Sequence, residues 1–437
     1  MATEGYDTEP PADAVAHVPA DRLVADDPWL SETEAARGPA SGRQQSDGRD
    51  IHASDPLRMP DAFAMRDGAA QADLLLDARD APPRSVALVL RGADEVQSDG
   101  VSVAQARHLM GARPRFDHYG RLAGAELVPL AELGRPRIDV VMTLSGIFRD
   151  LLPLQTRLLA EAAWLAASAD EPVEANAVRA HALAQVEATG CTLAEASLRV
   201  FSNAEGAYGS NVNGLIDSGA WDDEGELADA YEARKGWAYG PDGRAARNAD
   251  ALAANLARVD LAYQNLESVE LGVTTVDHYF DTLGGISRAV KRAKGAEAPV
   301  FIGDATTGAA KVRTLADQVA LETRTRSLNP KWFEGMLRHG AEGVRHIESQ
   351  VTNTLGWSAT TGAVEPWVYQ RLSETFVLDE AMRRRLGELN PQASARMANR
   401  LLEAGDRNFW APDDATLAAL QDAADELEDR LEGVAAE

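Results

Sequence analysis

The sequence has little cysteine and no long apolar run. Cys191 is the single cysteine among 437 residues, which excludes an internal disulfide framework and a cysteine-cluster metal site and fits a reducing cytoplasm. No run of about 18 apolar residues occurs, so we expect no membrane span. The first residues are acidic and contain proline, unlike the basic and then apolar pattern of a signal peptide. These features predict a cytoplasmic protein.

Lysine is also scarce, because arginine carries nearly all of the basic charge. Only five of the 43 basic residues are lysine, and 69 acidic residues bring the formal net charge to −26. Such an excess of negative charge disfavours nucleic acid and anionic membranes as partners. It also fits a salt-loving source, although a GC-rich genome alone would likewise replace lysine by arginine.

Composition divides the chain into three expected parts. Residues 1–50 are rich in Asp, Glu, Pro, Gly and Ser, so we expect a disordered acidic N-terminal extension. Residues 51–150 contain two apolar, β-branched runs, at 85–90 and 138–144, which predict buried strands of a small, mainly parallel α/β domain. Residues 151–437 have mainly helical periodicity. We therefore predict a mixed α/β fold that is predominantly α-helical, with a small parallel α/β layer followed by a large helical C-terminal region.

Three segments of the C-terminal part have distinct expectations. Residues 244–266 read as one long amphipathic helix, whose core face would be Leu252, Leu256, Val259 and Tyr263. Residues 300–302 predict a short strand. The acidic tail, residues 415–437, predicts an amphipathic helix docked through its leucines.

The stretch from Arg199 to Gly240 has the composition of a binding pocket. Its first half is a run of small and glycine residues, RVFSNAEGAYGSNVNG, and its second half ends in an aromatic pair, Trp237 and Tyr239. Glycine frees the backbone to approach a flat or bulky ligand, and polar groups between aromatics suit a ligand pocket. The alternative is a long surface loop that caps a helix. The polar candidates in this stretch are Glu205, Tyr208, Asn211 and Asn213.

A second polar cluster follows in the segment YQNLESVELGVTTVDHYFD, which contains Glu270 and His278. A histidine close to carboxylates can carry protons or bind a metal, although a lone histidine is more often structural. The segment has no HExxH pattern, so the sequence does not predict a preformed zinc site.

Two further residues are ligand candidates by position. Arg149 follows the strand at 138–144, and ligands of parallel sheets bind beyond the carboxyl ends of the strands. The favoured alternative is that Arg149 simply begins the next helix. Trp357 could stack on a flat ligand, with core packing as its alternative. The glycine-rich residues 303–308, GDATTG, lack the GxxxxGK[ST] spacing of an ATP-binding loop.

Four segments together resemble one known family. They are the Arg199–Gly240 stretch, the segment YQNLESVELGVTTVDHYFD, and the later segments VRTLADQVALETRTRSLNPKWFEGMLRHG and LGWSATTGAVEPWVY. In this order they resemble the C-terminal part of the large subunits of magnesium chelatase and aerobic cobaltochelatase, over residues from about 50 to the C-terminus. The resemblance implies a subunit that binds a tetrapyrrole and inserts a divalent metal.

The resemblance also implies partners and a substrate metal. ATP would be used by two ATPase-type subunits, which agrees with the missing ATP-binding loop. The motifs are nearer to the magnesium enzyme, which inserts Mg²⁺ into protoporphyrin IX. The first alternative is Co²⁺ insertion into a corrinoid precursor of cobalamin, and the second is a non-catalytic tetrapyrrole carrier or scaffold. The large component of the family is far longer than this chain. Three alternatives are open for its upstream domains: they are deleted, they are missing from this gene model, or they are encoded separately, in which case an upstream fragment of the large subunit would be a further partner.

Metal insertion requires removal of two pyrrole protons, delivery of the ion and a hold on the macrocycle. Carboxylates and histidine can accept protons and deliver a hard ion, while aromatic rings and arginines can hold the ring and its propionates. The catalytic candidates are Glu205, His278 and Glu270, of which Glu205 and His278 are also the metal candidates. The candidates for substrate binding are Tyr208, Asn211, Asn213, Trp237, Trp357 and Arg149.

Overall fold

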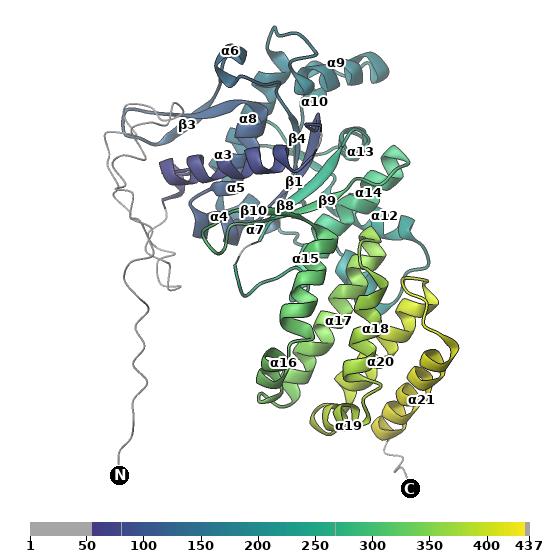
Figure 1. Ribbon diagram of the computed structural model, residues 1–437. Coiled ribbons are helices and arrows are strands. Elements are labelled where there is room, and N and C mark those ends of the chain that lie inside the picture. The colour runs from purple at the N-terminus through teal and green to yellow at the C-terminus, as the bar shows by residue number, and fades with distance from the viewer. Residues whose placement is uncertain (1–54, 80, 267, 433–437) are drawn as a thin grey trace, which may run out of the picture.

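The computed structural model describes residues 55–432, except residues 80 and 267. The expected N-terminal extension, residues 1–50, lies outside the described residues. Figure 1 shows a lobe built on a β-sheet above a lobe of helices. In the described part of the chain, no helix is both long and apolar enough to cross a membrane.

The sheet has eight strands in the order β10-β9-β8-β1-β4-β5-β6-β7. Five neighbouring strands run parallel: β9 (Val300–Asp304), β8 (Leu261–Asn265), β1 (Ser85–Leu90), β4 (Asp139–Leu144) and β5 (Val200–Ser202). The antiparallel strands at its two ends are β10 (Lys311–Thr314), β6 (Trp237–Tyr239) and β7 (Ala245–Arg247). The chain proceeds outward from β1 through β4 and β5, then returns to place β8 on the other side of β1. Strands β1 and β8 therefore flank a topological switch point.

Helices cover both faces of the sheet, which explains why β1 and β4 are buried along their whole length. One face packs against α3 (Ala62–Asp77), α5 (Val101–Met110) and α8 (Pro153–Ser168). The other face packs against α12 (Glu224–Lys235), α13 (Ala249–Leu256) and α14 (Gly285–Lys294). The core on this second face is the larger one, because it continues into the helical lobe.

Shorter elements connect these parts. On the sheet lobe they are η2 (Pro56–Arg58), α4 (Gly92–Ser98), the hairpin of β2 (Ala112–Phe116) and β3 (Leu122–Leu127), α6 (Leu130–Leu133), α7 (Gly146–Leu151), α9 (Ala177–Thr189), α10 (Leu193–Ala196) and α11 (Val212–Ser218). A π-helical segment, η3 (Phe280–Gly284), runs directly into α14.

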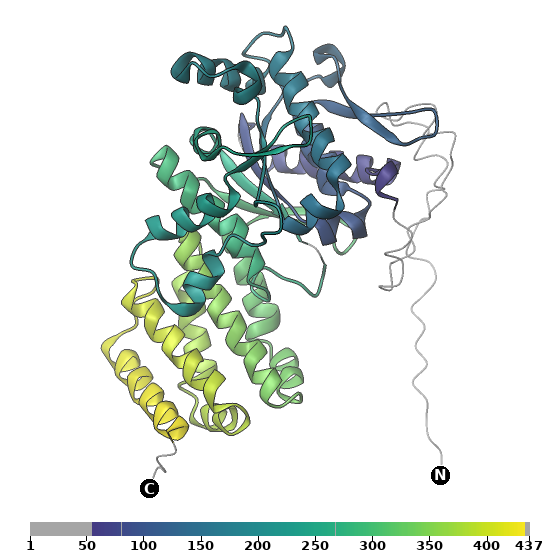
Figure 2. The same cartoon turned by 180° about the vertical axis from the view of Figure 1, so that it is seen from behind.

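The helical lobe is built around α17 (Ala341–Thr361), whose residues 350–361 are all buried. Its remaining helices are α15 (Leu315–Glu322), the π-helical η4 (Thr323–Ser327), α16 (Pro330–Leu337), α18 (Pro366–Phe376), α19 (Glu380–Leu389), α20 (Pro391–Asp406) and α21 (Asp414–Leu431). Figure 2 shows these helices from behind, with α21 in yellow along the outside of the lobe. The expected tail helix forms over Asp414–Leu431. Of the four leucines expected to dock it, Leu420 and Leu427 are buried, Leu417 is half-buried and Leu431 is 45% exposed; residues 433–437 lie outside the described residues.

The predicted mixed α/β, mainly helical fold is confirmed, but the sheet is larger than expected. Its strands continue to Thr314, far beyond the expected end of the α/β part at residue 150. The long helix expected over 244–266 is wrong, because this segment forms β7, α13 and then β8. The apolar residues recur every three or four positions, which imitates a helix, yet residues 261–265 pair with β1 and β9. A strand buried on both faces has no polar alternation to reveal it.

Candidate functional site

The glycine-rich loop of residues 203–211 starts where β5 ends, at the carboxyl edge of the sheet. The buried Asp281 of η3 holds the end of this loop: its Oδ2 accepts from the Ser210 amide at 2.7 Å and its Oδ1 from the amides of Val212 and Asn213 at 2.9 and 3.1 Å. Three backbone donors on one carboxylate fix the loop to η3. Segments of π-helix frequently mark functional sites.

Lys235, at the end of α12, lies beneath the same loop. Its ammonium donates to the Leu144 carbonyl at 3.1 Å and to Asn203 Oδ1 at 2.8 Å, and the Asn203 amide donates to the Gly209 carbonyl at 2.7 Å. Burial lowers the pKa of Lys235 to about 7, the nearby Asp281 opposes this change, and Arg91 and Arg149 add to it. The sequence interpretation missed Lys235, although a lysine in a chain with only five, next to the apolar segment of β6, was an available signal.

Arg149 anchors the start of the loop. Its Nη1 donates to the carbonyl of Ala204 at 2.6 Å, and its Nε donates to Asp150 Oδ1 at 2.7 Å. The hydroxyl of Tyr208 donates to the other oxygen of Asp150 at 2.6 Å. Hydrogen bonding from Arg149 holds the pKa of Asp150 below its usual value. Arg149 therefore does more than begin α7, but its guanidinium is largely buried and turned toward protein groups.

The second motif, the segment YQNLESVELGVTTVDHYFD, forms a loop whose backbone is held by side chains of the helical lobe. Glu322 of α15 accepts from the amides of Val273 and Thr274, both at 2.9 Å. From α17, Trp357 Nε1 donates to the Val273 carbonyl at 2.8 Å and Asn353 donates to the Thr274 carbonyl at 2.9 Å. The two later segments that carry the family resemblance thus supply side chains that hold the loop of residues 268–276.

Gly272 and Arg326 also contribute to holding this loop. A Cβ atom at Gly272 would lie 2.4 Å from Glu322 Oε2, so only glycine permits this approach. Arg326 of η4 donates to the carbonyl oxygens of Val269 and Glu270. Glu270, a catalytic candidate, keeps its side chain exposed on this loop.

The structure brings the two motifs into contact. Asn213 Nδ2, from the first motif, donates to Asp277 Oδ2, from the second, at 2.6 Å. Asp277 directly precedes His278 in the sequence. The half-buried His278 ring lies 4.8 Å from the Tyr279 ring, measured between centroids. Glu205 is exposed on the first loop. Two motifs about 70 positions apart therefore form one region at the carboxyl edge.

The remaining candidates for substrate binding lie in different surroundings. Asn211 is exposed and has a left-handed backbone with φ of 65°, whereas Tyr208 exposes 56% of its surface beside the Arg149 guanidinium. Trp237 is half-buried on β6 and packs against the smaller core, on the α3 and α8 face of the sheet. Trp357 is completely buried. The two tryptophans are packing residues in this conformation.

Neither metal candidate belongs to a preformed metal site. Within residues 55–432, apart from the two gaps, no group of three or more His, Cys, Asp or Glu side chains is arranged to hold a metal ion. Glu205 and His278 would therefore need further ligands from a substrate or another polypeptide.

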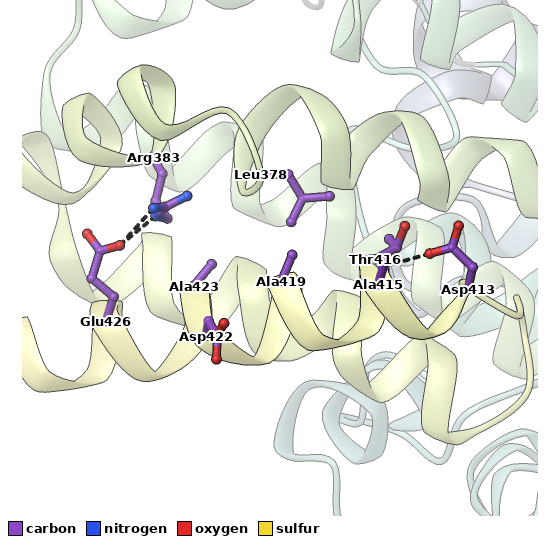
Figure 3. A pocket seen from close by; sticks show the side chains of 9 residues that line it. All are labelled: Leu378, Arg383, Asp413, Ala415, Thr416, Ala419, Asp422, Ala423 and Glu426. Atoms are coloured by element: carbon purple, nitrogen blue, oxygen red, sulfur yellow. Dashed lines mark hydrogen bonds and ion pairs between the residues drawn. The ribbon is translucent and has the colours of Figure 1, made fainter.

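A hollow of about 490 Å³ lies elsewhere, in the helical lobe between α19 and α21 (Figure 3). Arg383 forms an ion pair of 2.8 Å with Glu426 at one end of it. Its lining consists of Leu378, Arg383, Asp413, Ala415, Thr416, Ala419, Asp422, Ala423 and Glu426. None of these residues comes from the two motifs, so the hollow is separate from the candidate site.

Comparison with known proteins places the chain among metal chelatase subunits. The family described as CobN/Magnesium Chelatase matches residues 39–417. The chain is 73% identical over 391 residues to a magnesium-chelatase subunit of Cereibacter sphaeroides, covering 89% of this chain and 33% of that protein. It is 34% identical over 378 residues to the aerobic cobaltochelatase subunit CobN of a Sinorhizobium species, covering 84% and 30%.

A solved structure supports the same relationship. The catalytic subunit of cobaltochelatase from Mycobacterium tuberculosis matches with a TM-score of 0.82 and 36% sequence identity, over 85% of this chain and 32% of that one. The chain thus spans about a third of the length of these relatives. The family match extends over most of the sequence, and the chain belongs to the CobN/magnesium chelatase family.

Proposed function

We propose that the chain is the C-terminal portion of a chelatase large subunit that inserts Mg²⁺ into protoporphyrin IX. The observation that carries this proposal is the 73% identity to a protein named as a magnesium-chelatase subunit, against 34% to a cobaltochelatase subunit. The anchored loops at the carboxyl edge of the sheet support it, since ligands of such sheets bind at that edge.

In this proposal, Glu205 and His278 accept the two protons that leave the pyrrole nitrogens. Glu205 is exposed, whereas the His278 ring is half-buried and its Nε2 atom is closed to solvent. A general base must come within hydrogen-bond reach of the proton that it removes. The backbone anchors to Asp281 and Glu322 would keep the two loops in place while the flat substrate enters. Glu270 on the second loop is the third candidate.

The metal enters as a substrate. Mg²⁺ prefers oxygen ligands and keeps several waters. With no cluster of three metal ligands among the described residues, the ion would be held by one or two side chains until the ring nitrogens bind it.

The proposal includes partners. Two ATPase-type subunits would use ATP, as the family resemblance implies. Residues 303–308 agree with this, since they lack the spacing of an ATP-binding loop. The portion of the relatives that this chain does not span would be supplied by an upstream part of the large subunit, in the same polypeptide or as a separate fragment. Purified alone, the chain should show no ATP hydrolysis above background.

Cobalt insertion into a corrinoid precursor is the second candidate function. It is favoured by the structural match to a cobaltochelatase catalytic subunit, which covers 85% of this chain. A non-catalytic tetrapyrrole carrier or scaffold is the third.

Reconstitution would distinguish these functions. The chain would be mixed with the upstream fragment, both ATPase subunits, ATP and a porphyrin, and metalloporphyrin formation followed by fluorescence with Mg²⁺ or by absorbance with Co²⁺. We expect Mg²⁺ insertion that requires this chain. Insertion of Co²⁺ alone, with a corrinoid precursor as substrate, would favour the second function. Porphyrin binding without insertion of either metal would favour the carrier.

A further inference from the structure

Gln264, near the end of β8, is buried with an unused side-chain amide. Its exposed fraction is 1%, and neither its amide nitrogen nor its amide oxygen has a hydrogen-bond partner among the residues that the structure describes. Native proteins bond nearly all buried polar groups, so an exception calls for a specific explanation. A ligand that bonds the amide when it binds is one such explanation.

The position of Gln264 agrees with a ligand site. Gln264 pairs with Ile302 of β9, and strand alternation places it on the face of Ala262 and the larger core. The π-helical segment η3 packs against β8, and η3 holds the first loop through Asp281. Strands β1 and β8 also flank the switch point of the sheet, where ligands of parallel sheets bind.

Positive charge gathers at the same edge. Arg91 follows β1 in extended conformation, two residues after Val89 of the larger core, so it points to the same face as Gln264. Arg91 and Arg149 both lower the pKa of Lys235, after the larger effect of burial. These three basic groups are therefore near one another. Arg149 is paired with Asp150 and Asp281 lies near Lys235, so we assign the attraction for an anion to Arg91.

We propose that the end of β8 and the turn after β1 form a carboxylate subsite, in which Gln264 and Arg91 bind one propionate of the tetrapyrrole. The guanidinium can donate two parallel hydrogen bonds to a carboxylate, and the Gln264 amide nitrogen donates to the same group. The inference rests on the proposed function, because it takes a tetrapyrrole as the ligand. It adds to that function a specificity for acidic over esterified rings.

The test measures the affinity of the full chain for deuteroporphyrin IX and for its dimethyl ester, by porphyrin fluorescence. The variants are Gln264→Leu and Arg91→Gln. The matched control is Gln71→Leu, because Gln71 is also buried with an amide oxygen that has no partner in the described part of the chain, but it lies on α3 at the opposite face of the sheet. We expect the wild-type chain to prefer the diacid.

Each subsite variant should bind the diacid about 10-fold more weakly or worse, since hydrogen bonds to charged groups are among the stronger ones. Binding of the ester should stay unchanged, and Gln71→Leu should bind both rings as the wild type does. Gln264→Leu removes no side-chain hydrogen bond between the described residues of the ligand-free protein, so its melting temperature should not fall. A loss of affinity then reports on the ligand and not on folding.

Two results would overturn the subsite and leave the proposed function standing. The variants could bind the diacid as tightly as the wild type, or they could lose the diacid and the ester equally. A wild-type chain that binds neither ring would overturn both the subsite and tetrapyrrole binding by this chain.

Discussion

Buried polar side chains have different partners at the two edges of the parallel sheet. At the amino edge, Asp139 of β4 is a buried carboxylate with close partners: Arg199 Nε donates to its Oδ1 at 2.6 Å, and His181 Nδ1 lies 2.8 Å from its Oδ2. Burial opposes ionisation, but Arg199 and His181 outweigh it and hold the pKa of Asp139 below its usual value. This edge is a paired ionic cluster.

At the carboxyl edge, buried polar groups are less completely paired or change their charge. Within the described ranges, Gln264 has no partner for its amide. Burial lowers the pKa of Lys235 to about 7. Burial, followed by the nearby Asp94, raises the pKa of Glu95 to about 8, although Glu95 accepts a 3.3 Å hydrogen bond from the Val103 amide at the start of α5.

The difference indicates that the edges serve separate purposes. At the amino edge the Asp139 carboxylate is satisfied within the chain, although the buried Ser85 hydroxyl and Arg199 Nη2 have no hydrogen-bond partner among the described residues. Unpaired amides and shifted pKa values are instead found where a protein interacts with something else. Both chelatase-like loops also leave from or return to the carboxyl edge. The following predictions test this division of roles.

The largest effect should come from breaking the amino-edge cluster. Arg199→Leu leaves the Asp139 carboxylate buried beside a single histidine, so the free energy of unfolding should fall by about 3–5 kcal/mol. Urea unfolding followed by circular dichroism measures this change. The control is Arg244→Leu, whose side chain is 88% exposed and should change stability by less than about 0.5 kcal/mol. If both substitutions lowered the free energy of unfolding equally, the buried ion pair at the amino edge would stabilise the fold no more than an exposed arginine does.

Substitution of the proposed proton acceptors at the carboxyl edge should instead alter chemistry with little change in stability. Glu205→Gln and His278→Ala should each lower metal insertion in the reconstituted complex by about 10²-fold or more, the usual size of a general-base contribution. Porphyrin affinity and the melting temperature should change little. Glu187→Gln, exposed on α9, serves as the control. Full activity in both variants would contradict the proposed proton acceptors.

Lys235 should give the carboxyl edge a pH dependence in the alkaline range, from about 7 to 10.5. The unfolded chain holds Lys235 near its ordinary pKa of 10.5, while the folded pKa is about 7. Between these values the unfolded state binds more protons, so stability should rise with pH by about 1.4 kcal/mol per unit. The gain is complete above about 10.5 and lost as pH falls toward 7.

Lys235→Met isolates this contribution. The difference in unfolding free energy between wild type and variant should depend on pH from about 7 to 10.5 and be constant below 7. Titration of other groups cancels in the difference. A constant difference throughout that range would mean that the buried lysine keeps its ordinary pKa.

The smallest effect should come from salt, which acts on the outer surface more than on either edge. An acidic excess of 26 charges repels itself, and the screening length falls from about 30 Å at 0.01 M salt to about 3 Å at 1 M. The melting temperature, measured by calorimetry, should therefore rise from low to molar salt. A flat or falling profile would remove the salt-adapted interpretation of the composition.

Local patterns allowed the strands of the carboxyl edge to be predicted in part. Apolar, β-branched runs marked β1, β4 and β9, because a buried parallel strand reads as a short continuous apolar segment. The same signal was missed for β8, because Tyr263 continues the three- to four-residue spacing of apolar residues that begins in α13 and therefore looks like part of the same helix. Without β8, the sequence could not reveal the switch point.

The site could be predicted only as a set of motifs. Glycines and polar residues marked the loop after β5, and the segment around His278 was recognised as a second polar cluster. Their contact depends on Asp281 reaching amides about 70 positions earlier in the chain, which no local spacing encodes. Trp357 shows the reverse case, since a residue singled out as a ligand candidate supports the second loop from inside the core.

The strand order also has a consequence for synthesis of the protein. β8, one of the two neighbours of β1, emerges roughly 170 residues after β1, or about 9–35 s later at ordinary elongation rates. During that interval β1, which is apolar except for Ser85, has an unpaired edge of the kind that recruits other strands and aggregates. Strands β1, β4 and β5 are therefore synthesised well before β8, which pairs with the other side of β1. Expression yield should therefore depend on chaperones that shield nascent chains, more than the stability of the finished fold would suggest.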